Sequence, residues 1–130
     1  MNIEEVRLKC LSKHDTVEEC TPFSNSGYPD IAFKIAGKIF AFLCIPEGPC
    51  CQKVDTPHLL VLKCDPVRAL ELREKYPRII EPAWHWNKKY WNQVHYDKLP
   101  AALVDRLITE SLAEVVKKLP KRKRQELALD

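Results

Sequence analysis

The chain has 130 residues, of which 45% are hydrophobic and 30% charged, a composition typical of an ordinary globular domain with one core. Its three glycines and ten prolines argue against a glycine-rich phosphate loop or a flexible linker. The longest apolar run, residues 39–45, is too short to span a bilayer, and the acidic N-terminus lacks the pattern of a secretory signal. We therefore expect a cytoplasmic protein with no membrane partner.

The first half of the chain predicts one helix followed by three strands. Asn2 is a suitable helix N-cap with Glu5 as its capping-box partner, and apolar residues at three- and four-residue steps follow. Three apolar segments then have the patterns of strands, the second with both faces covered: residues 31–36, 39–45 and 59–64. The predicted connections are loops over 12–30 and 46–57 and a turn at Gly37-Lys38.

The second half predicts two more strands between two helices. Asp65-Pro66 is a typical helix start, and Tyr76-Pro77 ends that helix. Strands are expected at residues 78–81 and 91–96. Pro100 opens the longest helix, whose apolar stripe must cover the sheet: Leu103, Val104, Leu107, Ile108, Leu112, Val115 and Val116.

Together these elements predict an α+β fold of two layers, with helices against an antiparallel five-stranded sheet, in the order α-β-β-β-α-β-β-α. We expect residues 1–120 to form a single domain and residues 121–130 a basic C-terminal tail or short helix.

Neither metal nor catalytic chemistry is predicted. The six cysteines contain no C-x-x-C pair, and none has a histidine at zinc-finger spacing: Cys10, Cys20, Cys44, Cys50, Cys51 and Cys64. Reducing conditions favour free thiols, and only the adjacent Cys50 and Cys51 merit a test for redox or metal chemistry. The histidines are scattered, and no serine or cysteine lies in a nucleophile motif. We expect no catalytic residues, no metal and no cofactor.

Positive charge is concentrated at the C-terminus. Residues 1–112 carry 15 basic and 15 acidic groups, so the net charge of +3 arises from residues 113–130. The basic residues there are Lys117, Lys118, Lys121, Arg122, Lys123 and Arg124. Such a cluster attracts nucleic acid through phosphates, but it also suits a helix C-terminus or a solvated tail. The charge pattern is compatible with both interpretations.

The most informative segment is residues 84–92, which holds all three tryptophans of the chain, Trp84, Trp86 and Trp91. Aromatic faces stack on bases and lysines meet phosphates, so this mixture suits nucleic acid. The candidate binding residues are Trp86, Asn87, Lys88, Lys89 and Tyr90. Alternatively, the tryptophans are core anchors and Asn87 fixes the geometry of a solvated turn.

The pattern His85-x-Asn87-Lys88-Lys89-x-Trp91-Asn92 resembles the MmcQ/YjbR family of small bacterial proteins. Leu99-Pro100, Lys118-Leu119-Pro120-Lys121 and upstream segments at residues 33–41, 62–66 and 71–77 extend the resemblance over nearly the whole chain. It implies a YjbR-like fold, similar in layout to secretion chaperones, and a predicted DNA-binding function. Trp86 and the Cys50-Cys51 loop depart from the family pattern.

We therefore predict a non-enzymatic DNA-binding protein whose partner is DNA. Lys88 and Lys89 would position phosphates, while Trp86, Asn87 and Tyr90 would touch bases or sugars. The C-terminal cluster would add non-specific attraction through Lys121, Arg122, Lys123 and Arg124. Two alternatives are a protein-interaction or adaptor domain that holds a peptide or protein partner, and a small-molecule site walled by the three tryptophans.

Overall fold

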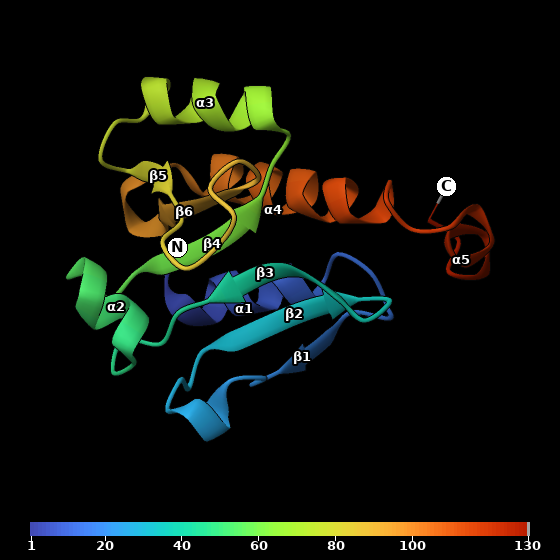
Figure 1. Cartoon of the computed structure of the whole chain (residues 1–130), viewed down its shortest axis with the longest axis horizontal. Coiled ribbons are helices and arrows are strands. Elements are labelled where there is room, and N and C mark those ends of the chain that lie inside the picture. Colours follow the sequence, from blue (N-terminus) through green and yellow to red (C-terminus); the bar gives the residue numbers. More distant parts are fainter. Residues whose placement is uncertain (130) are drawn as a thin grey trace.

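Six antiparallel strands form one sheet in the order β1-β2-β3-β4-β6-β5 in a computed structural model that describes residues 1–129 (Figure 1). The strands are β1 (Glu18–Cys20), β2 (Ile31–Ile35), β3 (Lys38–Leu43), β4 (Leu59–Lys63), β5 (Ile80–Pro82) and β6 (Trp91–His95). The helices are α1 (Ile3–Leu11), α2 (Pro49–Val54), α3 (Pro66–Lys75), α4 (Ala101–Val116) and α5 (Lys121–Glu126). The α+β class and the antiparallel sheet are confirmed.

The sheet has six strands, so the prediction of five was wrong. The additional strand, β1, lies within the predicted loop 12–30 and pairs with β2 at the edge of the sheet. Its sequence, Glu-Glu-Cys, has no apolar alternation because it pairs through its backbone and keeps its side chains largely in solvent. The predicted loop 46–57 likewise contains the short helix α2, which begins at Pro49 after Gly48.

The turn between β2 and β3 lies one residue earlier than predicted. Ala36 and Gly37 both have positive φ angles, 50° and 78°, as a two-residue hairpin turn of type I′ requires. Ile35 therefore pairs directly with Lys38, which becomes the first residue of β3.

The helix starts that the sequence predicts are confirmed in atomic detail. Asn2 Oδ1 accepts a hydrogen bond from Glu5 N at 2.8 Å, and Glu5 Oε1 accepts one from Asn2 N at 3.0 Å. Asp65 Oδ2 accepts from the amides of Val67 and Arg68 at 3.1 and 3.2 Å. These carboxylate and amide side chains satisfy backbone donors that the first helical turn leaves unpaired.

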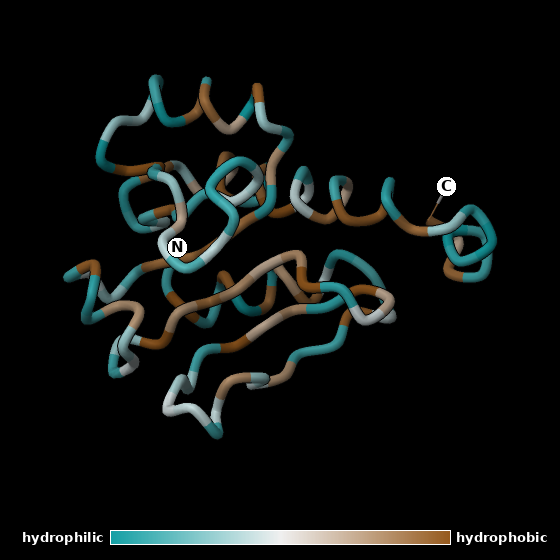
Figure 2. Tube along the Cα trace, viewed as in Figure 1, coloured by the Kyte–Doolittle hydropathy of each residue, from teal (hydrophilic) through white to brown (hydrophobic). Residues whose placement is uncertain are grey.

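The two faces of the sheet are covered differently. The main core lies between one face of the sheet and the helices α1, α3 and α4. Of these helices, α4 packs across β3 and β4. The opposite face carries a smaller apolar cluster formed with α2 and the segment 83–91, which crosses the near side of the sheet in Figure 1. In Figure 2 apolar residues follow the strands and one side of α4, whereas α5 is hydrophilic. The segment 83–91, which holds the aromatic candidate residues, therefore lies on the face opposite the long helices.

Within residues 1–129, no helix has both the length and the apolar character required to cross a membrane.

Candidate nucleic-acid interface

The aromatic segment is anchored by its indole rings. Trp86 packs against Phe42 and Trp91, with ring centroids 5.3 and 4.5 Å apart, and is half-buried. Trp84 packs on His85, with ring centroids 3.8 Å apart. The tryptophans thus serve the smaller apolar cluster while leaving part of each ring accessible. This packing supports the interpretation of the indoles as anchors without removing them from the surface.

Asn87 shapes the turn that follows. Its Oδ1 accepts a hydrogen bond from Lys89 N at 3.1 Å, and its backbone carbonyl accepts from Tyr90 N and Trp91 N. This is the local side-chain-to-backbone bonding for which asparagine is favoured in turns. Lys88 and Lys89 stand at the tip, and both are exposed. The turn therefore presents two ammonium groups on a backbone that Asn87 fixes.

Arg73 of α3 holds this turn in place, a role that the sequence reasoning missed. Its Nε donates to Asn92 Oδ1 at 2.7 Å, and its Nη2 donates to the carbonyl of Lys88. Asn92 is only 2% exposed and donates in turn to the carbonyl of Ala69. Burial lowers the pKa of Arg73, yet a guanidinium stays charged at neutral pH. Arg73 therefore ties the turn that carries Lys88 and Lys89, which we call the lysine turn, to α3.

Three lysines from distant parts of the chain surround the ring of Tyr90. The Nζ atoms of Lys63, Lys89 and Lys118 lie 6.0, 5.5 and 5.9 Å from its centroid. Lys63 ends β4, Lys89 lies in the aromatic turn and Lys118 follows α4. An aromatic face attracts cations, so Tyr90 organises ammonium groups that would otherwise repel one another.

An open groove of about 470 Å³ lies beside this cluster, and we call it the lysine groove. Its lining residues include three lysines and no carboxylate: Gly37, Lys38, Ile39, Lys63, Trp91, Val115, Lys118 and Leu119. In the described part of the chain, residues 1–129, none of the three ammonium groups forms a salt bridge with a carboxylate. The groove is therefore a positively charged surface without internal neutralisation.

Buried Ser111 of α4 fixes the base of the lysine groove. Its Oγ accepts a hydrogen bond from Lys63 N at 2.7 Å and donates to the carbonyl of Phe40. Lys63 is also opposite Trp91 in the β4–β6 pair. The strand end that carries Lys63 is thus attached to α4 and, through Trp91, to the aromatic segment.

The predicted site residues fall into two separate groups. Trp86, Asn87, Lys88, Lys89 and Tyr90 lie together in the turn, next to the groove. The other four predicted residues belong to α5, which lies beyond the C-terminal end of α4 (Figure 1): Lys121, Arg122, Lys123 and Arg124. Within α5, Arg122 and Lys123 both pair with Glu126, at 3.4 and 3.6 Å.

Of the C-terminal basic cluster, Lys118 reaches Tyr90. The sequence analysis counts Lys118 in the C-terminal basic cluster but does not include it among the candidate binding residues. Lys38 and Lys63 were missed, because each stands in a strand and only the sheet order brings them together.

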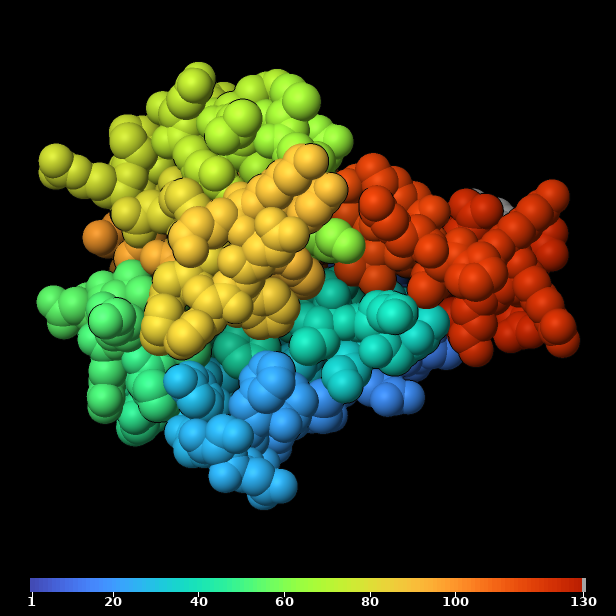
Figure 3. Space-filling model, in the orientation of Figure 1, coloured from blue at the N-terminus to red at the C-terminus, as the bar shows by residue number. Residues whose placement is uncertain are grey.

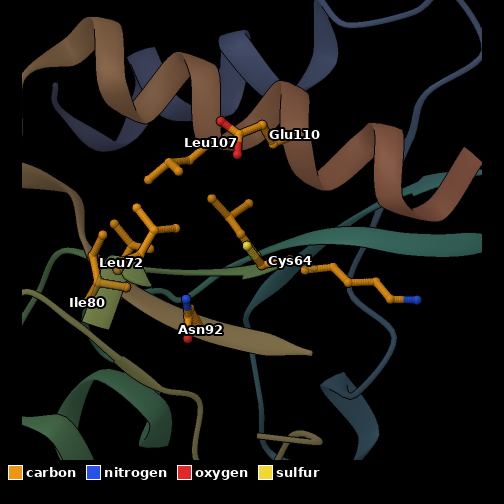
Figure 4. A pocket seen from close by; sticks show the side chains of 9 residues that line it. Cys64, Leu72, Ile80, Asn92, Leu107 and Glu110 are labelled. Carbon is orange, nitrogen blue, oxygen red and sulfur yellow. The ribbon is translucent and has the colours of Figure 1, made fainter. Parts of the chain in front are cut away.

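The interior offers little room for a ligand. A cavity of about 10 Å³ lies between α4, β4 and β6, where Leu72, Ile80 and Leu107 close around Cys64 and Asn92 (Figure 4). That volume is near the smallest that one water molecule occupies. This cavity is therefore too small for an organic ligand.

The thiols are mostly buried, and all six are free. Burial raises the pKa of Cys10 to about 12 and that of Cys64 to about 11. The pKa of Cys51 is lowered by a hydrogen bond from Cys44, whose own pKa is raised by its bonds to Cys50 and Cys51. Among residues 1–129, no three His, Cys, Asp or Glu side chains are placed to hold a metal ion.

The family model for YjbR matches residues 11–113. The chain belongs to the YjbR family. Protein DR2400 of Deinococcus radiodurans, a DUF419-domain protein, has a crystal structure similar to this one, with a TM-score of 0.82 at 32% sequence identity. That similarity covers 99% of this chain and 89% of the other. The family membership suggested by the sequence pattern is confirmed.

A crystal structure of a protein from Pseudomonas syringae is also similar, with a TM-score of 0.68 at 27% identity over 85% of this chain and 96% of the other. No curated protein matches the chain. The similarities establish the family and the fold.

Proposed function

We propose that this YjbR protein is a non-enzymatic DNA-binding protein of the cytoplasm that holds DNA by its phosphates. The observation that carries the proposal is the convergence of Lys63, Lys89 and Lys118 on Tyr90 at the edge of the lysine groove. Phosphates are the polyanion that such unpaired ammonium groups attract, and the attraction requires no particular base sequence. The free thiols agree with a reducing compartment.

Each part of the surface has a role in this proposal. Lys38, Lys63 and Lys118 bind phosphates in the groove, and Lys88 and Lys89 bind them at the turn. The accessible faces of Trp86 and Tyr90 and the side chain of Asn87 contact bases or sugars. The separate basic patch on α5, residues 121–124, adds non-specific attraction.

Salt dependence of binding tests the proposal. Wild-type protein is titrated with a fluorescently labelled duplex and with its single strand by anisotropy over a range of salt concentrations. We expect log affinity to fall linearly with log salt. The double variant Lys63→Gln/Lys118→Gln should flatten this slope by about 1.4 to 1.8 units if each lysine neutralises one phosphate. Lys88→Ala/Lys89→Ala tests the turn in the same way.

A matched control separates the groove from general charge. Lys75→Gln/Lys98→Gln removes the same two charges from exposed positions outside the groove, so its salt slope should stay closer to that of the wild type. No binding at low salt would refute the proposal. An equal change in slope for both double variants would refute the assignment to the groove, and capture of a peptide instead of DNA would favour the adaptor alternative.

A further inference from the structure

A second cavity lies on the other side of the aromatic segment, and we call it the ring pocket. Its volume is about 380 Å³, within the range of small-ligand sites. Five of its lining side chains carry rings: Phe23, Tyr28, Phe42, His85 and Trp86. The remaining lining residues, Ser26 and Cys50, are uncharged. The ring pocket therefore favours a flat, uncharged group that stacks against aromatic faces.

The ring pocket and the lysine groove share one wall. Trp86 lines the pocket, Trp91 lines the groove, and the centroids of the two indoles are 4.5 Å apart. Figure 3 shows the segment 84–90, in yellow, on the same face as the blue segment 20–28 and the red C-terminal end of α4. A site for phosphate and a site for a flat ring are thus separated by one pair of aromatic side chains in contact, Trp86 and Trp91.

We propose that the ring pocket binds the base of an unpaired nucleotide whose backbone phosphates lie in the lysine groove, so that the protein prefers single-stranded to duplex DNA. This inference rests on the proposed function and adds the form of its ligand. In a duplex the faces of the bases are stacked and only their edges are exposed. A pocket walled by rings can be occupied only by a base that has left the stack.

Phe23 leaves part of its ring accessible at the wall of the ring pocket. Phe23 is 42% exposed, with its centroid 5.8 Å from that of Phe42, and Phe42 is itself packed on Trp86. His85 stands at the pocket with a φ of 70°, a backbone angle that non-glycine residues rarely adopt. Such angles persist where surrounding structure imposes them, often at binding sites. Stacking on these rings would accept any base.

The decisive comparison uses two single strands that differ only in their bases. A labelled oligothymidylate of 12 nucleotides, an abasic strand of the same length and a 12-bp duplex are titrated with the wild-type protein by anisotropy. We expect the thymidylate to bind roughly 5- to 150-fold more tightly than the abasic strand, the range for stacking of one base. Their salt slopes should be equal because their phosphates are the same. Quenching of tryptophan fluorescence by the thymidylate alone would locate the base at residues 84–91.

Variants of Phe23 connect the preference to the pocket. Phe23→Ala should reduce thymidylate affinity towards that of the abasic strand with an unchanged salt slope, whereas Phe23→Tyr retains a ring and should retain the preference. Leu70→Ala is the matched control, because Leu70 is a 57% exposed apolar residue on α3. Equal affinity for thymidylate and abasic strands, or a Phe23→Ala variant that behaves as wild type, would overturn the inference while leaving phosphate binding intact. Absence of binding to every DNA would instead overturn the proposed function and, with it, this inference.

Discussion

Replacing Arg73 with methionine should destabilise the protein by releasing the lysine turn. Methionine keeps most of the apolar stem but removes the guanidinium that donates to Asn92 Oδ1 and to the Lys88 carbonyl. Asn92 is buried, so its oxygen loses its donor where water has little access, whereas the carbonyl of Lys88 can turn to solvent. An unsatisfied buried acceptor costs about 1–3 kcal/mol, and we expect a total loss of about 1.5–3 kcal/mol. For a chain of this size the loss lowers Tm by roughly 5–10 °C.

Urea unfolding measures this loss with two signals that report on different regions. Tryptophan fluorescence follows residues 84–91, where all three indoles lie, and far-ultraviolet circular dichroism follows the whole chain. Arg73→Lys should lose an intermediate amount, since an ammonium group cannot reproduce the fork of a guanidinium. Arg106→Met on the exposed side of α4 is the matched control. An Arg73→Met variant within about 0.5 kcal/mol of that control would show that indole packing alone holds the turn.

Three further predictions follow from buried or paired groups. Ser111→Ala should lower stability by about 1–3 kcal/mol in the same unfolding assay, because backbone groups of β3 and β4 lose their shared partner. In the folded protein at pH 8, Cys10 and Cys64 should resist Ellman's reagent until urea is added, and early reaction of both would contradict their raised pKa values. A hydrogen bond from Lys13 lowers the pKa of Asp105, so the stabilisation is present above the unfolded pKa of about 4 and is lost as pH falls through the folded pKa. Asp105→Asn should therefore reduce stability at pH 7 but much less at pH 2.5.

The long-range fold was predictable where burial leaves a periodic pattern. The stripe of α4 indicated a helix from Pro100 that covers the sheet, and the helix runs over Ala101–Val116 against β3 and β4. The two apolar sets of β3 correctly indicated a strand covered on both faces. β1 left no such signal, because an edge strand of three residues is specified by its partner's backbone and not by its own side chains.

The candidate site was predictable only in part, for a related reason. The turn with Lys88 and Lys89 is contiguous in the sequence, so its composition marked it. The lysine groove is assembled from the start of β3, the end of β4 and the end of α4, and no spacing rule joins Lys38, Lys63 and Lys118. A hydrophilic residue ending an apolar strand, as Lys63 does in Leu-Leu-Val-Leu-Lys, was the available signal. Such a residue does not reveal which other lysines lie near it until the strand order is known.

The lysine groove lies where the start of β3, the end of β4 and the start of β6 meet the C-terminal end of α4, so its charge sits at the border of the main core. Val115 and Leu119 in its lining are buried, whereas Lys38 and Lys118 are exposed and Lys63 is half-buried. The three lysines of the groove keep their charged ends in solvent, and replacing them removes little buried area. Lysine-to-glutamine variants of the groove should therefore change binding with little change in Tm, whereas Ser111→Ala beneath it should lower Tm. If the groove variants also lowered Tm strongly, the lysines would be part of the folded framework, and the separation of the charged groove from the apolar core would be wrong.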